Sequence, residues 1–162
     1  MDPGPATRDR PALRLERHYD GIAPEALWQA WTDPQALSAW FGPGPDHSVT
    51  LAQTDVRVGG SFRVAFRMAD GQEHDVGGRY RAVEPHRRLV FTWAWRSTPE
   101  RESLVTVRLV PTAQGTRMDF LHEQFFDEAA RDGHEGGWTA SFDKLARHLR
   151  PGAAPTNPGA TS

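Results

Sequence analysis

Hydrophobic and polar residues alternate along most of the middle of the chain, a pattern typical of β-strands that bury one face. Between residues 47 and 124 the alternation recurs in segments separated by turn-forming residues. These segments are 48–56, 61–68, 74–85, 89–95, 103–111 and 116–125. Asp70 and Gly71 both tolerate the positive φ of a tight turn and predict a hairpin between the second and third segments. Residues 12–20 alternate in the same way, so we expect an antiparallel meander with one further strand near the N-terminus.

Two short helices are predicted directly after the first strand, within residues 22–42. Pro24 suits a first helical position, and Leu27 and Trp31 share one helix face. Asp33 is placed to cap a second helix that Pro34 opens. Gly42 and the proline that follows it predict its end.

The last predicted element is an amphipathic helix over residues 127–149. Trp138, Phe142, Leu145 and Leu149 follow spacings of four, three and four and form one apolar stripe. We expect interruptions at Gly133 and at the Gly136–Gly137 pair, since glycine weakens a helix by about 1 kcal/mol relative to alanine. Close packing of the helix backbone on the sheet is the leading explanation for the glycine pair, and a hinge that admits a ligand is the alternative.

This order of elements predicts an α+β fold. One helix is too narrow to cover an antiparallel sheet of six to seven strands unless the sheet curves around it, which leaves a cavity between them. Residues 1–11 and 150–162 are rich in Pro, Gly, Ala and Thr and are predicted to be flexible or disordered tails. The predicted domain is therefore 12–149.

Composition removes several kinds of chemistry. The chain of 162 residues has no cysteine, which excludes disulfides, thiolate metal sites and a cysteine nucleophile. The seven histidines show neither HExxH nor HxH spacing, so we predict no metal site. The glycine-rich phosphate-binding motifs of nucleotide sites are missing as well, and we predict no cofactor.

The charge pattern bears on the partners that we expect. The net charge is −2, and arginines and acids are interleaved, so no nucleic-acid partner is predicted. The sequence has neither a signal peptide nor an apolar run long enough to span a membrane, and it predicts a cytoplasmic protein. Whether the protein is a monomer or a homodimer stays open.

Four stretches in order along the chain resemble the SRPBCC, or START-like, superfamily. They are similar to the C-terminal domain family of the activator of the heat-shock-protein-ninety ATPase, and they cover 17–43, 55–71, 78–93 and 132–145. The resemblance implies a helix-grip fold and an internal apolar pocket for a small hydrophobic molecule, without specifying which. The activator's separate chaperone-docking domain has no counterpart in this sequence.

Strand parity supplies the candidate ligand-binding residues. On 116–125, His122 shares the inward face with Met118 and Phe120, so it is a pocket candidate, although a hydrogen-bonded core histidine is the commoner role. Trp93 and Trp95 share an inward face and carry N–H groups that suit a partly polar cavity. The full set of predicted ligand-binding residues is Trp40, Phe66, Tyr80, Trp93, Trp95, His122, Trp138 and Phe142.

Three functions are consistent with the sequence. The first is a carrier or sensor that binds a small hydrophobic ligand without catalysis. The second is an enzyme of the polyketide cyclase or aromatase kind, with His122 as acid or base. The third is a protein-binding module that modulates a chaperone. No catalytic residue is assigned, and we lean towards the first function.

Overall fold

Seven strands form one antiparallel sheet in this computed structural model, which describes residues 10–42 and 47–149. The strands lie in the order β1-β7-β6-β5-β4-β3-β2. Their bounds are Leu13–Asp20 (β1), His47–Thr54 (β2), Ser61–Met68 (β3), Glu73–Glu84 (β4), Arg88–Trp95 (β5), Ser103–Pro111 (β6) and Gly115–Glu123 (β7). The predicted tails lie almost wholly outside the described residues.

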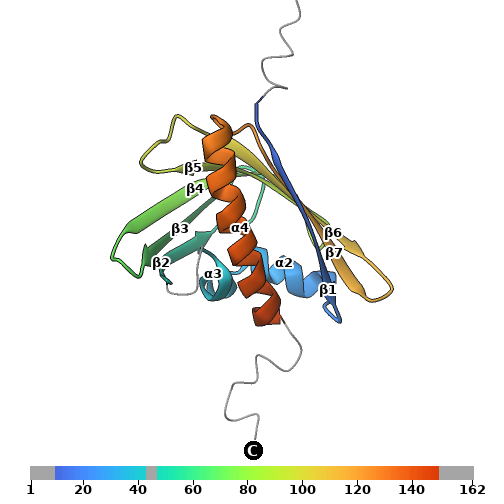
Figure 1. The fold of residues 1–162 in the computed structure, drawn as a ribbon. Helices are drawn as coiled ribbons and strands as arrows, with labels where there is room; N and C mark the ends of the chain where they lie inside the picture. Colours follow the sequence, from blue (N-terminus) through green and yellow to red (C-terminus); the bar gives the residue numbers. More distant parts are fainter. Residues whose placement is uncertain (1–9, 43–46, 150–162) are drawn as a thin grey trace, which may run out of the picture.

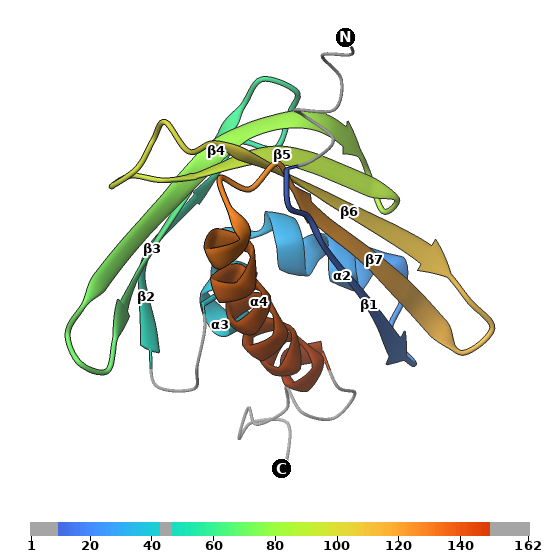
Figure 2. The same ribbon diagram turned by 45° about the horizontal axis from the view of Figure 1, so that its top comes forward.

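The three helices lie on the concave side of the sheet (Figures 1 and 2). They are α2 (Pro24–Thr32), α3 (Pro34–Trp40) and α4 (Glu128–Leu149). Asp33 caps α3 as predicted, because its carboxylate accepts a hydrogen bond from the Ala36 N–H. The sheet curves around α4, as expected because one helix is too narrow to cover a flat sheet of this width. The predicted α+β helix-grip fold is therefore confirmed.

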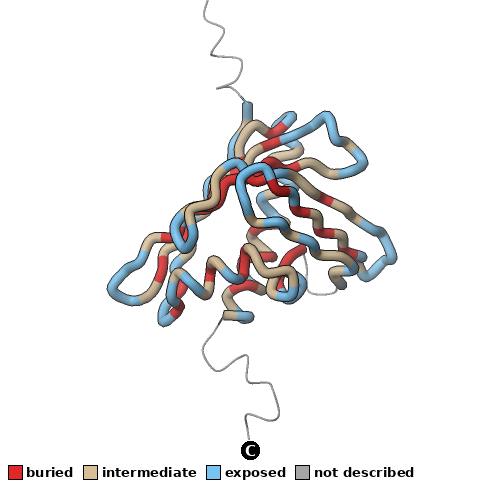
Figure 3. Tube along the Cα trace, turned by 180° about the vertical axis from the view of Figure 1, so that it is seen from behind, coloured by how far each residue is buried: buried red, intermediate tan, exposed pale blue. Residues whose placement is uncertain are grey.

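Burial alternates along the strands, as the sequence pattern predicts (Figure 3). His122 on β7 is completely buried, whereas its neighbours Leu121 and Glu123 are half-buried. On β5, burial extends to both faces, from Leu89 to Trp93. The sheet and helices therefore share one apolar core, and α4 contributes Trp138, Phe142 and Leu145 to it.

Glycine permits a close approach of two strands at the centre of the sheet. A side chain at Gly78 of β4 would overlap the Thr92 carbonyl oxygen of β5. The register between these strands shifts between Tyr80 and Ala82, which marks a β-bulge. The absence of a side chain at Gly78 thus lets β4 and β5 approach closely beside the bulge.

The predicted interruption of the last helix is wrong. α4 runs without a break over 22 residues from Glu128 to Leu149, through Gly133, Gly136 and Gly137. Glycine lowers helix stability but does not prevent helical dihedral angles, and packing of the apolar stripe on the sheet outweighs its cost. Among the described residues, no helix is long and apolar enough to cross a membrane.

Candidate functional site

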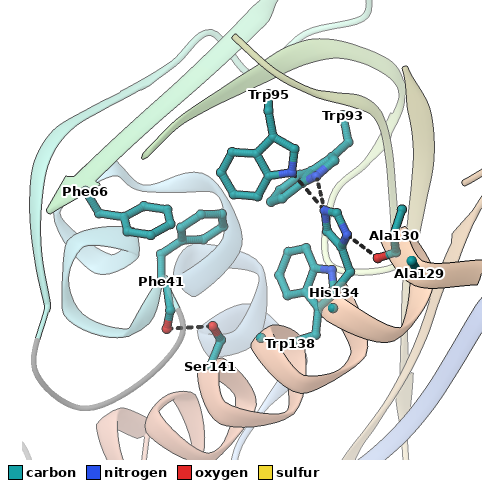
Figure 4. Close-up of a pocket in the computed structure, with 12 residues that line it drawn as sticks. Phe41, Phe66, Trp93, Trp95, Ala129, Ala130, His134, Trp138 and Ser141 are labelled. Carbon is teal, nitrogen blue, oxygen red and sulfur yellow. Dashed lines mark hydrogen bonds between the residues drawn. The ribbon is translucent and has the colours of Figure 1, made fainter. Parts of the chain in front are cut away.

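A pocket of about 330 Å³ lies between α4, the end of α3 and strands β3 and β5 (Figure 4). We call it the central pocket. It is mostly apolar and has no charged side chain in its lining. The lining residues are Phe41, Gly42, Phe66, Trp93, Trp95, Ala129, Ala130, Gly133, His134, Gly137, Trp138 and Ser141.

Small residues make the helical wall of the central pocket. Ala130, Gly133, Gly137 and Ser141 follow spacings of three, four and four, so they share one face of α4. A Cβ atom added at Gly133 would meet no other atom within 4 Å. The space beside this face is therefore the pocket, and larger side chains here would occupy it.

The close-packing explanation for the glycine pair on α4 does not hold at Gly136. A Cβ atom added there also meets nothing within 4 Å, so no neighbouring backbone requires the missing side chain. Its neighbour Gly137 lines the central pocket. The structure therefore relates Gly133 and Gly137 to the pocket and leaves Gly136 without a packing reason.

Aromatic rings form the opposite walls. Trp93 and Trp95 lie two residues apart on β5 and point inward, with their ring centroids 5.5 Å apart. Phe41 meets Trp138 edge to face at 5.8 Å, and Phe66 meets Trp95 at 6.2 Å. Because each ring packs against the next, the walls are held in place by one another.

His134 is the one titratable group in the lining, and its hydrogen bonds define its tautomer. Its Nε2 accepts hydrogen bonds from the indole N–H groups of Trp95 at 2.9 Å and Trp93 at 3.2 Å. Its Nδ1 lies 2.7 Å from the Ala130 carbonyl oxygen and must donate to it. Burial lowers the pKa of His134, so the ring is neutral at pH 7.

His122 lies behind the pocket wall and has partners for both ring nitrogens. Its Nδ1 accepts from the Trp138 indole N–H at 3.0 Å, so its Nε2 carries the proton and donates to the Ser103 hydroxyl at 2.7 Å. Ser103 in turn donates to the Trp93 carbonyl oxygen at 3.3 Å. Burial, with a smaller contribution from His134, lowers the pKa of His122 well below its usual range. This ring presents no nitrogen to the central pocket.

The structure brings together half of the predicted ligand-binding residues. Phe66, Trp93, Trp95 and Trp138 line the central pocket. The other four, Trp40, Tyr80, His122 and Phe142, are buried side chains outside its lining.

These four residues pack in the core or behind the pocket. The Trp40 indole donates to the Ala30 carbonyl oxygen at 2.9 Å, and Phe142 packs 5.0 Å from Phe120. Tyr80 borders a separate void of about 10 Å³, too small for a ligand. Alternation along a strand predicts the face of the sheet to which a side chain points. It does not predict whether that side chain then contacts the helix or lines the pocket.

Sequence reasoning missed His134 and the small-residue face of α4. The predicted apolar stripe starts at Trp138, after the glycines, and His134 lies one helical turn before it. The detectable signal is the recurrence of small residues every three to four positions from Ala130 to Ser141. Among the described residues, no group of three or more His, Asp or Glu side chains is arranged to hold a metal ion.

The curved sheet around a long C-terminal helix, with two short helices after the first strand, defines a helix-grip protein of the SRPBCC superfamily. The family described as "Activator of Hsp90 ATPase homolog 1-like protein" (AHSA1) matches residues 22–150. The chain belongs to this family.

Solved structures agree with this assignment. The AHSA1 protein from Silicibacter pomeroyi is 34% identical, with a TM-score of 0.75, over 86% of this chain and 97% of that one. A protein from Chromobacterium violaceum is 29% identical, with a TM-score of 0.78, over 87% and 99%. One from Nitrosomonas europaea is 25% identical, with a TM-score of 0.73, over 88% and 96%. The comparison with curated proteins finds no match.

Proposed function

We propose that this protein binds a small, largely apolar molecule in the central pocket and acts as a carrier or sensor. The observation that carries the proposal is the pairing of small residues on α4 with aromatic walls on the sheet. Gly133 and Gly137 line the same pocket as the rings of Trp93, Trp95 and Phe66, and a Cβ atom at Gly133 would meet nothing within 4 Å. Ligand sites are commonly concave, apolar and of this size.

The hydrogen-bonding groups around the pocket support an apolar ligand. The indole N–H groups of Trp93 and Trp95 are both directed to His134, and that of Trp138 is directed to His122. The Ser141 hydroxyl donates to the Gly42 carbonyl oxygen at 2.8 Å. A ligand here gains free energy mainly from burial of apolar area, at about 25 cal/mol per Å².

Two glycines on α4 supply a matched pair for the test. Gly133 and Gly136 are both helical, and a Cβ atom at either meets nothing within 4 Å, but only Gly133 lines the central pocket. Gly133→Leu should weaken binding of the neutral probe 2-naphthylacetamide at least tenfold, because the new side chain occupies the pocket. Gly136→Leu should leave binding unchanged.

Isothermal titration calorimetry measures the affinity of the probe in both variants and in the wild type. Circular dichroism verifies that both variants keep the fold. Equal affinities in the wild type and Gly133→Leu would show that the probe binds elsewhere. Absence of binding by any neutral aromatic or aliphatic probe would contradict the proposal.

The geometry does not favour the cyclase alternative. An acid or base must reach the reacting atom, and His122 is completely buried with both nitrogens engaged inside the protein. His134 borders the pocket, but its Nε2 lone pair already accepts from two indoles. We also do not propose chaperone modulation, because it rests on the family's description alone.

A further inference from the structure

A second pocket, of about 460 Å³, adjoins the central pocket and shares Phe66 and Trp95 with it. We call it the outer pocket. It lies where β4 begins and β5 ends, and its lining is polar apart from the two shared rings. His74, Arg96 and Ser97 are among its polar residues. A ligand that leaves the central pocket past Phe66 and Trp95 therefore meets polar side chains.

The outer pocket is lined by two acids, Glu73 and Asp75, and by Arg96, and two further arginines outside the lining pair with the acids. Glu73 pairs with Arg67 at 3.0 Å, and Asp75 forms a bidentate pair with Arg63, with a shortest distance of 2.7 Å. Arg96 has only a longer contact of 3.5 Å to the same Asp75 carboxylate. Three arginines thus face two carboxylates, and the most weakly paired of the three lines the pocket.

His74 adds a hydrogen-bonding group next to the shared rings. Its ring centroid lies 5.3 Å from that of Phe66, its cross-strand partner, and 5.8 Å from that of Trp95. Neither ring nitrogen has a hydrogen-bond partner among the described residues, and one of them carries a proton that it can donate. Half-buried beside apolar rings, His74 is placed to bind a polar group of a ligand that extends from the central pocket.

We propose that the ligand is an amphipathic anion. Its apolar body occupies the central pocket, and its acidic group lies in the outer pocket near Arg96 and His74. This inference rests on the proposed function and adds the class of ligand. A carboxylate or sulfonate fits this arrangement because a guanidinium offers it paired N–H donors, whereas the acids Glu73 and Asp75 already have arginine partners.

Two probes of nearly the same shape separate the two proposals. 2-Naphthylacetate carries a carboxylate, and 2-naphthylacetamide replaces it with a neutral amide. The wild type should bind the carboxylate about fivefold more tightly at low salt, the size of effect expected of a partly exposed ion pair. Raising the ionic strength should reduce this preference, since salt screens exposed charges.

Arg96→Gln should abolish the preference and leave the affinity for the amide unchanged. Arg57→Gln is the matched control, because Arg57 is an exposed arginine paired with Asp55 before the start of β3, away from the outer pocket. It should retain the preference. Calorimetry of both probes on the three proteins measures all these affinities.

The outcomes distinguish the two proposals. Equal binding of both probes by the wild type, or a preference that Arg96→Gln leaves intact, would overturn the anionic ligand while the central pocket remained a binding site. Failure of both probes to bind would contradict the proposed function and this inference with it.

Discussion

Trp138 of α4 donates a hydrogen bond to His122 of β7 over 3.0 Å, in a part of the core from which solvent is excluded. This bond joins the long helix to the sheet. It also sets the His122 tautomer, which directs the other ring nitrogen to Ser103. The polar atoms at the back of the central pocket are thereby satisfied without a ligand.

Replacement of His122 should destabilise the fold, because its hydrogen-bond partners Trp138 and Ser103 remain buried without it. We expect His122→Leu to lower the free energy of unfolding by about 2–4 kcal/mol, because the buried Trp138 N–H loses its acceptor and the Ser103 hydroxyl oxygen loses its donor. His122→Gln should cost less, since an amide both accepts and donates. Urea unfolding of the two variants measures the difference, and equal losses would show that shape matters more than hydrogen bonding here.

Loss of the Trp138 side chain should have a larger effect. Its indole packs 4.7 Å from Phe120 and 5.0 Å from Trp93, and it is almost completely buried. We expect Trp138→Ala to cost about 3–5 kcal/mol in urea unfolding, as is usual for a large core aromatic. The half-buried Trp28 is the control, and Trp28→Ala should cost less than half as much. Comparable losses would contradict the central position assigned to Trp138.

The two buried histidines should make stability depend on pH. Burial lowers the pKa values of His122 and His134 below the ordinary 6.5, so below pH 6.5 the unfolded chain binds protons that the folded protein does not. Their contribution is complete above pH 6.5 and is lost as the pH falls, by up to about 1.4 kcal/mol per pH unit for each histidine.

His134→Gln tests this dependence. Urea unfolding between pH 7.5 and 5.5 should show a smaller loss of stability in the variant than in the wild type. The exposed His148 supplies the control, and His148→Gln should follow the wild type. Identical curves for the wild type and His134→Gln would mean that His134 takes up a proton in the folded protein as easily as in the unfolded one.

Alanine substitutions of glycine should have opposite effects on the helix and on the sheet. Gly136→Ala should stabilise the protein by about 0.5–1 kcal/mol, because the helical site is open and alanine is the better helix former. Gly78→Ala should destabilise it, since the new Cβ atom would overlap the Thr92 carbonyl oxygen. Thermal unfolding of both variants gives the signs, and a stable Gly78→Ala variant would show that the two strands can separate locally.

Local pattern alone determined most of the architecture. Alternation predicted the seven strands, Asp70 and Gly71 predicted the turn at which Gly71 adopts a φ of 90°, and Asp33 predicted the cap of α3. Each depends on contacts or dihedral angles within a few residues, which the order of amino acids specifies directly. The inward direction of His122 follows from strand parity for the same reason.

The site was decided by tertiary structure. Whether an inward residue such as His122 or Trp95 packs in the core or borders a pocket depends on where α4 lies above it, and no local period encodes that position. The continuity of α4 through its glycines likewise depends on packing energy that the sheet supplies. His134 meets Trp93 and Trp95 across about 40 positions of chain, so only the folded protein brings these rings together and leaves the central pocket beside them.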